Sequence, residues 1–461
     1  MDPKKLFIKT YGCQMNEYDS TRMADLLAPL GYAATQDPAQ ADLVILNTCH
    51  IREKATEKVY SDLGRLRPFK EERLAQGKTQ ILAVAGCTAQ AEGAEIMRRM
   101  PIVDAVFGPQ SYHKLPEIIA RAVRSAETGI REGRGVLEVD FPPESKFDSL
   151  PQARPTGYTA FLAIQEGCDK FCHFCVVPYT RGAEYSRPAK DVIKEAKELV
   201  TGGVQEITLL GQNVNAYHGD APGKGTWSLG RLCHELADQI PSLKRLRYMT
   251  SHPRDVNDEL ILAHKNVGIL MPYLHLPLQS GSDRILQAMN RQHTFDVYKR
   301  TLDKFRQARS DIAFTSDFIV GYPGETESDF TETLRAVEEV GYAAAYSFAY
   351  SKRPGTPASA LDHQVPEDVK KERLARLQDL LQTQQKIFNQ NCIGQEMPVL
   401  FEKKGRREGQ LAGRSPYLQS VYATAPERLL GQIISVKITG ATLSSLTGEV
   451  VLSQSVLQGR F

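Results

Sequence analysis

Short apolar runs recur in the first quarter of the chain, and each is followed by a stretch with apolar residues at helical spacing. Residues 6–10, 43–46 and 81–85 form runs typical of buried strands, and a fourth run lies near residues 103–107. Strands that alternate with helices form βαβ units and hence parallel sheets. Residues 1–125 therefore predict an open parallel α/β sheet domain.

The rest of the chain predicts a linker and two further domains. Residues 126–155 are rich in glycine, proline and charge, which is typical of a linker. Residues 156–391 contain six apolar runs separated by helix-like segments, which predict a partial (βα)6 barrel with its chemistry at the carboxyl ends of the strands. The runs are residues 161–164, 206–210, 245–249, 273–276, 313–320 and 344–348. Residues 392–461 have short alternating strands and predict a small β-barrel.

Composition narrows the class of protein only slightly. The chain has 461 residues, with 57 Lys and Arg against 55 Asp and Glu, so its net charge neither demands nor excludes a nucleic-acid partner. No apolar run approaches the length of a membrane span, and the first residues lack the apolar core of a secretion signal. We therefore expect a soluble cytoplasmic protein with no membrane partner. Because thiols stay reduced in that compartment, the eight cysteines favour metal binding or catalysis over disulfides.

Three cysteines follow the first barrel strand in the pattern C-x3-C-x2-C. Cys168, Cys172 and Cys175 can hold three irons of a four-iron cluster and leave the fourth iron open to a substrate. A zinc site is the alternative, but it needs a fourth Cys or His, and the local candidate is His173 inside the triplet. The spacing, with an aromatic residue before the last cysteine, resembles the radical SAM superfamily. The resemblance implies that S-adenosylmethionine (SAM) chelates the open iron and is cleaved to a 5′-deoxyadenosyl radical.

Turns at other strand ends lie where this superfamily contacts SAM. The resemblance implies that the turn after residues 206–210 meets the SAM amino group, and that the turns after residues 273–276 and 313–320 approach its ribose or adenine. Each turn is equally explained as ordinary punctuation between a strand and a helix. The expected SAM contacts are Gly211, Gln212, Asn213, Gln279, Ser280 and Gly321. Arg181, on the loop after the triplet, is expected to hold substrate or the SAM carboxylate through bidentate hydrogen bonds.

Three more cysteines recur at the same phase of three successive βα units. Cys13, Cys49 and Cys87 each follow a predicted strand, at spacings of 36 and 38 residues. Neighbouring parallel strands lie about 4.8 Å apart, so three adjacent carboxyl ends span only about 10 Å and could share one cluster. The alternative is three unrelated buried cysteines. Cys233 and Cys392 fit neither set, and the helical run around Cys233 favours a buried structural role.

Two sets of three cysteines followed by a β-barrel resemble the methylthiotransferases, over about residues 6–455, and the barrel resembles their RNA-binding TRAM domain. Residues 11–20, 47–55 and 176–182 resemble the branch of this family that acts on isopentenyladenosine in tRNA, although His50 stands where relatives often have a small residue. The resemblance implies transfer of a methylthio group to carbon 2 of isopentenyladenosine next to the anticodon, with two SAM per turnover. One SAM would methylate a sulfur on the Cys13 cluster, and the second would yield the radical at the Cys168 cluster.

The resemblance also implies two [4Fe-4S] clusters, SAM, a tRNA carrying isopentenyladenosine, an electron donor, and an iron-sulfur repair or carrier protein; we expect a monomer. Basic and aromatic residues of the barrel are candidates for RNA contact: Lys403, Lys404, Arg406, Arg407, Arg414, Tyr417 and Tyr422. Relatives that act on threonylcarbamoyl-adenosine in tRNA or on a ribosomal-protein aspartate are alternatives. An iron-sulfur RNA-binding regulator without turnover is an alternative of another class, and it would need no SAM pocket.

Overall fold

The computed structural model describes residues 3–50, 53–128, 135–142, 145–155 and 157–451. Two compact units make up the chain, and each is described by itself. The N-terminal unit comprises Met1–Arg154, Glu166–Asp169 and Val176–Arg187. The C-terminal unit comprises Pro155–Gln165, Lys170–Cys175 and Pro188–Phe461. None of the helices in these described ranges is long and apolar enough to cross a membrane.

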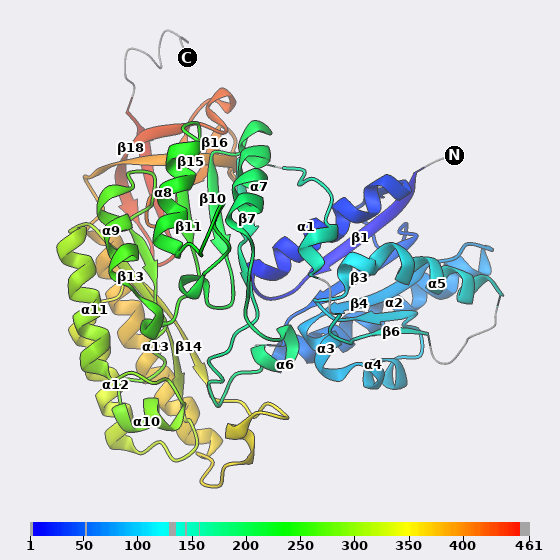
Figure 1. The fold of residues 1–461 in the computed structure, drawn as a ribbon, viewed down its shortest axis with the longest axis horizontal. Helices are drawn as coiled ribbons and strands as arrows, with labels where there is room; N and C mark the ends of the chain where they lie inside the picture. The colour runs from blue at the N-terminus through cyan, green and yellow to red at the C-terminus, as the bar shows by residue number, and fades with distance from the viewer. Residues whose placement is uncertain (1–2, 51–52, 129–134, 143–144, 156, 452–461) are drawn as a thin grey trace. The chain divides into compact units, whose positions relative to one another are not determined.

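The N-terminal unit is built on a six-stranded sheet in the order β2-β1-β3-β4-β5-β6, with every neighbouring pair parallel (Figure 1). The strands are β1 (Lys4–Thr10), β2 (Tyr32–Ala34), β3 (Leu43–Thr48), β4 (Ile81–Gly86), β5 (Ala105–Phe107) and β6 (Val136–Glu138). The helices are α1 (Gln14–Leu27), α2 (Glu53–Ala75), α3 (Cys87–Glu92), α4 (Ala94–Arg99) and α5 (Leu115–Thr128). The strand order reverses between β1 and β3, which is the switch point where ligands bind in open α/β sheets.

Helices cover both faces of this sheet. Leu27 of α1 and Ile118 of α5 pack in a core on one face. Leu63 of α2 and Met97 of α4 pack in a second core on the other face. Because β3 and β4 are buried on both faces, they read as continuous apolar runs rather than as alternating ones.

Two strands of this sheet are absent from the sequence prediction. Both β2 and β6 have three residues and lie at the edges of the sheet, and so short a strand carries no detectable period. β6 falls inside the stretch interpreted as a linker, residues 126–155, and pairs with β5. Lys146 from the same stretch is buried. Part of the expected linker therefore belongs to the N-terminal domain.

The first part of the C-terminal unit has the six parallel strands expected of a partial (βα)6 barrel. They form two three-stranded sheets, β11-β10-β7 and β12-β13-β14, joined by a parallel bridge between Leu246 and Leu270. The strands are β7 (Thr159–Ala163), β10 (Glu206–Leu210), β11 (Arg245–Tyr248), β12 (Tyr273–His275), β13 (Ala313–Val320) and β14 (Ala344–Ala349). The helices are α7 (Ala189–Thr201), α8 (Leu229–Gln239), α9 (Asp258–Asn266), α10 (Asp283–Ala288), α11 (Phe295–Ala308), α12 (Glu327–Val340) and α13 (Glu367–Gln390). Three short elements lie near the cysteine triplet in the sequence: β8 (Gln165–Glu166), α6 (Val177–Arg181) and β9 (Tyr185–Ser186). Of these, α6 and β9 belong to the N-terminal unit.

The last five strands close into the small β-barrel that the sequence predicts (Figure 1). They are β15 (Glu396–Lys404), β16 (Gln410–Arg414), β17 (Ser420–Thr424), β18 (Ile433–Ala441) and β19 (Ser445–Val450), in the order β15-β16-β17-β19-β18. Val399, Phe401, Val421, Val436 and Leu446 fill the interior and are fully buried. Alternate residues of each strand face inward, which accounts for the alternation seen in the sequence.

Two buried arginines attach this barrel to the parallel strands. Arg245 and Arg247 of β11 lie beside Glu206 of β10, with Arg247 Nε 2.9 Å from Glu206 Oε1 and Arg245 Nη1 3.5 Å from Glu206 Oε2. Their remaining N–H groups donate to backbone carbonyl oxygens of the barrel, those of Pro398, Arg414, Ser415 and Pro416. The barrel is therefore held on the parallel strands by charge-assisted hydrogen bonds.

Candidate functional site

The structure brings Cys13, Cys49 and Cys87 to the carboxyl ends of three adjacent strands in the N-terminal unit. Cys13 follows β1 and caps the start of α1, Cys49 follows β3 directly, and Cys87 follows β4 as the first residue of α3. Since β3 pairs with both β1 and β4, the three cysteines follow neighbouring strands. Cys13 and Cys49 flank the switch point between β1 and β3, where the sheet topology opens a crevice, and Cys87 follows the next strand, β4.

The backbone before Cys13 comes close to Cys49. Gly12 adopts φ +98°, and a Cβ atom there would lie 2.2 Å from Cys49 Cβ and 2.6 Å from its Sγ. Only glycine therefore allows β1 and β3 to converge at this point. A hydrogen bond with Cys49 lowers the pKa of Cys13 despite its burial, and the charge of Arg181 lowers it further. Thiolate is the form that ligates a metal.

Arg181 is buried in a network of ion pairs within the same unit. Its Nη2 lies 2.7 Å from Asp19 Oδ2, and its Nη1 lies 2.6 Å from Glu166 Oε1. Lys146 Nζ lies 2.7 Å from the same Glu166 oxygen and 3.5 Å from Asp19 Oδ1. The four side chains are at most 3% exposed. Arg181 was expected to hold substrate or the SAM carboxylate, and in the structure its guanidinium pairs with the carboxylates of Asp19 and Glu166.

Cys168 lies two residues after β8, in the N-terminal unit. Its backbone N–H donates to Gly182 O over 3.2 Å. The preceding residue, Gly167, has φ +74°, and a Cβ there would lie 1.9 Å from Ala183 O. The backbone on the two sides of the triplet therefore packs too closely at this point for any side chain at position 167.

Cys172 and Cys175 lie in the C-terminal unit, where the backbone N–H of Cys175 donates to Cys172 O over 2.9 Å. Arg291 Nη1 donates to Cys172 Sγ over 3.5 Å. His173, the local candidate for a zinc ligand, places Nδ1 2.9 Å from Ala288 O, and its backbone pairs with Met289 and Ala358. His173 therefore fixes the loop that carries Cys172 and Cys175 to the (βα)6 part of the C-terminal unit.

Neither set of thiols is arranged around a single ion. Across the described residues, no three His, Cys, Asp or Glu side chains are grouped so that they could hold one metal ion. A four-iron cluster needs no such convergence, because each thiolate binds a different iron. All eight cysteines are within the described ranges, and none forms a disulfide. Three reduced thiols on each set fit the ligand chemistry of an iron-sulfur cluster.

The turn after β10 is fixed by Gln165. Its Oε1 accepts the backbone N–H groups of Gln212 and Asn213 over 2.9 and 3.1 Å. A Cβ at Gly211 would lie 2.4 Å from the same oxygen, so a larger residue there would displace the Gln165 amide from this position. Asn213 Nδ2 donates to Asp255 Oδ2 over 2.7 Å. All of these residues lie in the C-terminal unit.

Several buried polar atoms near the carboxyl ends of the (βα)6 strands have no hydrogen-bond partner within the described residues. They include Asn213 Oδ1 after β10, Ser251 Oγ and His252 Nε2 after β11, Gln279 Oε1 after β12 and Tyr350 OH after β14. Burial and the nearby Arg291 cation lower the pKa of His252, so its imidazole is neutral. Buried polar atoms are normally satisfied, and several unsatisfied ones at this end of the strands point to a ligand.

Four polar residues at this end of the (βα)6 strands were not predicted from the sequence: His252, Asp255, Lys170 and Arg291. Lys170 Nζ lies 2.7 Å from Asp255 Oδ1, and Asp255 in turn holds Asn213. The available signal was position, since His252 and Asp255 follow a barrel strand in the same way as the predicted turns.

Two expected SAM contacts have roles in packing. Ser280 Oγ accepts the N–H of Ser282 and lies 3.3 Å from Thr333 Oγ1 of α12. Gly321 has φ +72°, and a Cβ there would lie 2.4 Å from Lys370 Cγ of α13. These two positions are therefore explained by the approach of α12 and α13 to the strand ends.

Most of the predicted RNA-contacting basic residues of the small β-barrel lie on the β15–β16 hairpin. Lys403 and Lys404 are exposed at the end of β15, and Arg406 and Arg407 are exposed in the loop before β16. Lys404 Nζ lies 2.6 Å from Glu427 Oε1. Arg414 instead donates to Leu418 O and Ser420 Oγ, and the Tyr417 ring packs edge-on against Phe388 at 5.5 Å. Tyr422 is half-buried on β17.

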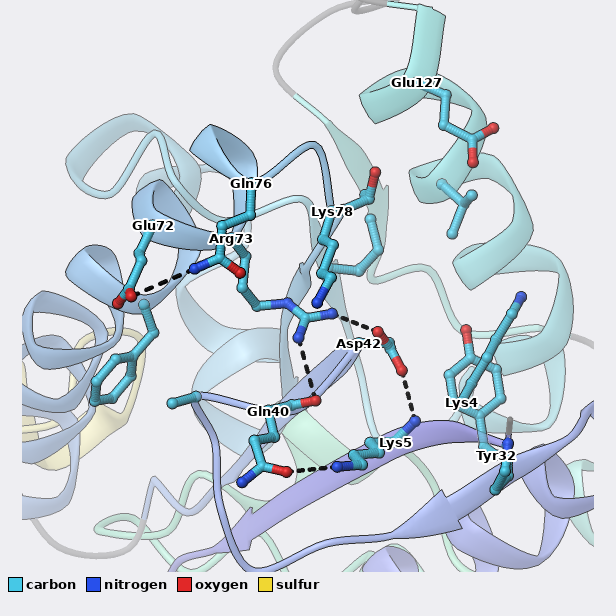
Figure 2. A pocket seen from close by; sticks show the side chains of 16 residues that line it. Lys4, Lys5, Tyr32, Gln40, Asp42, Glu72, Arg73, Gln76, Lys78 and Glu127 are labelled. Carbon is cyan, nitrogen blue, oxygen red and sulfur yellow. Dashed lines mark hydrogen bonds and ion pairs between the residues drawn. The ribbon is translucent and has the colours of Figure 1, made fainter. Parts of the chain in front are cut away.

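A cavity of about 720 Å³ lies in the N-terminal unit (Figure 2). It is at the amino ends of the strands, whereas the cysteines follow the carboxyl ends. It is lined by residues at the starts of β1 and β4 and by the end of α2. Asp42 accepts the backbone N–H of Lys5 over 2.7 Å and pairs with Arg73 inside it. None of the predicted site residues lines this cavity.

Comparison with protein families matches three successive parts of the chain. Residues 5–108 match the "Uncharacterized protein family UPF0004", residues 162–337 match the radical SAM superfamily, and residues 390–451 match the TRAM domain. Together these domains form the architecture of the methylthiotransferases. The radical SAM match implies a [4Fe-4S] cluster and SAM, and the TRAM match indicates RNA binding. The Cys168 triplet lies within the radical SAM match, and the Cys13 triad lies within the first.

Solved structures share the fold at low identity. The radical SAM methyltransferase TsrM from Kitasatospora setae, with cobalamin and a [4Fe-4S] cluster bound, is 14% identical, with 78% of this chain and 74% of that chain covered and a TM-score of 0.55. The cobalamin-dependent SAM radical enzyme OxsB, with aqua-cobalamin and SAM bound, is 11% identical, with 83% of this chain and 56% of that chain covered and a TM-score of 0.53.

Proposed function

We propose that the protein transfers a methylthio group to carbon 2 of isopentenyladenosine next to the anticodon of tRNA, with two SAM consumed per turnover. The observation that carries this proposal is the gathering of Cys13, Cys49 and Cys87 at adjacent strand ends of a domain outside the radical SAM match. One set of three thiols serves the superfamily chemistry. The second set requires a different task, and sulfur transfer is the task that an iron-bound sulfur can perform.

Cys168, Cys172 and Cys175 would hold the first [4Fe-4S] cluster, and Cys13, Cys49 and Cys87 would hold the second. When bound, the clusters and SAM supply the radical and the transferable sulfur that attack at an aromatic C–H bond requires, because that bond is neither acidic nor electrophilic. With three protein ligands in each set, one iron of each cluster stays open. An electron donor and a protein that restores iron and sulfur are the partners that this reaction needs.

The chain orients SAM through buried polar atoms at the strand ends. Asn213 Oδ1, His252 Nε2 and Gln279 Oε1 would pair with the ammonium and hydroxyl groups of SAM. A neutral His252 suits this role, because it can accept a hydrogen bond from a cation without repelling it. The Lys170–Asp255 pair fixes the amide of Asn213. Burial of these residues keeps water from the reacting atoms.

The β15–β16 hairpin would hold the RNA backbone. Lys403, Arg406 and Arg407 are exposed on it and can neutralise phosphates, which makes binding salt-dependent. A stem-loop RNA that carries the modified adenosine is therefore the expected minimal substrate.

The test uses the full chain, reconstituted without oxygen and supplied with SAM, a one-electron reductant and a stem-loop RNA carrying isopentenyladenosine. Mass spectrometry should find a methylthio group on that nucleoside, with 5′-deoxyadenosine and S-adenosylhomocysteine as co-products. Parallel reactions contain the threonylcarbamoyl-adenosine stem-loop or a ribosomal-protein peptide with the target aspartate. Product in one of these alone would assign the substrate to that branch. RNA binding without 5′-deoxyadenosine would assign the chain to the non-catalytic regulators.

A further inference from the structure

The Arg181 network contains equal numbers of buried positive and negative charges. Arg181 and Lys146 face Asp19 and Glu166, with the closest N···O distances at 2.6 to 2.7 Å. Burial of four ionisable groups has a desolvation cost that the ion pairs offset only partly, so such a network is weak support for stability by itself. The place of this network, beside the cysteines, is therefore more informative about function than its contribution to stability.

The network lies close to the thiols of the Cys13 triad. Burial raises the pKa of Cys87, and the charge of the nearby Arg181 acts in the opposite direction. Asn16 Oδ1 accepts from Arg181 Nη2 over 3.1 Å and lies 3.8 Å from Cys13 Sγ. The guanidinium thus carries a full positive charge next to two of the three thiols, inside a buried environment where charge is poorly screened.

The position of Arg181 is fixed at both the side chain and the backbone. The residue ends α6 and is followed by Gly182 at φ +81°. Its carbonyl oxygen accepts from Gln110 Nε2 over 2.6 Å. With the backbone and both Nη atoms engaged, the charge cannot move away from the thiols.

We propose that Arg181 is a positioning residue for the cluster held by Cys13, Cys49 and Cys87 and raises its reduction potential, while Asp19 lowers it. The inference rests on the proposed function, because it requires a cluster on this triad. One electron from a low-potential one-electron donor adds negative charge to the site, and no bond forms or breaks. A cation close to the ligating sulfurs stabilises the more negative state, and a carboxylate close to them has the opposite effect.

The experiment isolates this cluster in the full chain with Cys168, Cys172 and Cys175 replaced by Ala. After anaerobic reconstitution, the midpoint potential is measured by a redox titration followed by electron paramagnetic resonance. Arg181→Met should make one-electron reduction about tenfold less favourable, a shift of about 59 mV to lower potential. Asp19→Asn should shift the potential by a similar amount in the opposite direction.

Asp25→Asn is the matched control, since Asp25 is a buried carboxylate of the same helix that pairs with Arg22 at 2.8 Å. Its potential should equal that of the parent. If Arg181→Met does not fold, Arg181→Lys, which keeps the charge, and Asp19→Asn decide the matter: the lysine variant should stay close to the parent while the asparagine variant rises. Unchanged potentials, or shifts of one sign in both Arg181→Met and Asp19→Asn, would overturn the inference. A parent protein with no cluster would overturn the proposed function itself.

Discussion

The two sets of three cysteines are assembled in different ways. Cys168 to Cys175 span eight residues of one loop, whereas Cys13 to Cys87 span 75 residues and meet only because β1, β3 and β4 are neighbours. The loop set depends on local backbone, and the strand set depends on sheet order and on a close approach at Gly12. The same ligand chemistry can therefore be fixed by spacing in one place and by topology in another.

The two sets also differ in the charge around them. Arg291 donates to Cys172 over 3.5 Å and to the Pro277 carbonyl over 2.6 Å, so its positive charge faces neutral protein groups. Arg181 reaches the other set while paired with two carboxylates. A cation without a counter-charge favours binding of anionic groups, whereas a cation paired with carboxylates is held in one place, where it acts on the neighbouring thiols together with those carboxylates. Four predictions test whether the two sets are separate from each other and from the rest of the chain, from the largest expected effect to the smallest.

Replacing each set with alanine should abolish a different half of the chemistry. The variant without Cys168, Cys172 and Cys175 should form no 5′-deoxyadenosine but should still transfer a methyl group to the protein, because that step needs no electron. The variant without Cys13, Cys49 and Cys87 should still form 5′-deoxyadenosine and should make no methylthio product. Both products and S-adenosylhomocysteine are measured after each variant is shown to be folded. Methylthio-RNA from the second variant would make the strand set structural.

Gly12→Ala should remove only the strand-held cluster. Its Cβ would clash with Cys49 at 2.2 Å, and φ +98° adds strain of about 1 kcal/mol. Iron per chain should fall from about eight to about four atoms, since each cluster has four irons. Gly31→Ala is the control: Gly31 has φ +83°, but a Cβ there meets nothing within 4 Å, so iron should be retained. Full iron content in Gly12→Ala would show that the approach of β1 to β3 does not matter.

Neutralising the hairpin should weaken RNA binding without affecting either set of thiols. Lys403→Gln, Arg406→Gln and Arg407→Gln together should lower the affinity for the stem-loop about tenfold or more and reduce its dependence on salt. Lys437→Gln, an exposed change on β18, should leave binding unchanged. Deletion of the barrel is a poorer test, because it would leave Arg245 and Arg247 without their carbonyl partners. Unaltered affinity in the triple variant would exclude this hairpin from the RNA site.

Alanine at the two remaining cysteines should have the smallest effect. Cys233 is fully buried on α8, and Cys392 lies near the start of the barrel with its Sγ 3.4 Å from Phe388 O. Loss of one buried thiol should lower the free energy of unfolding by about 1 kcal/mol, measured by chemical denaturation. Iron content should stay at the wild-type value. A loss of iron in either variant would mean that it ligates a cluster.

The fold was largely predictable because the strands are apolar runs of useful length. The bounds of β10 and β13 coincide with the predicted runs 206–210 and 313–320. β2 and β6 could not be found, since three residues at a sheet edge show neither period nor burial in the sequence. The order of strands, which puts the switch point beside Cys13, also comes only from the structure.

The candidate site also has one part that could be predicted from the sequence and another that could not. Adjacent parallel strands made it possible to predict that Cys13, Cys49 and Cys87 would come together, without knowing any side-chain contact. The environment of Arg181 was not predictable, because Asp19 is 162 residues away in the chain and nothing local marks the pair. Unsatisfied atoms such as those of His252 are a property of packing and leave no pattern in the sequence.

The attachment of the small barrel has a consequence for how the two halves of the C-terminal unit can change over time. Arg245 and Arg247 bind main-chain oxygens, which every amino acid supplies. Gln385 and Asn389 of α13 likewise donate to the main-chain oxygens of Thr442 and Leu443. These contacts depend on the backbone path of the small barrel and not on its side chains, so the β15–β16 hairpin can change its side chains while these contacts are kept.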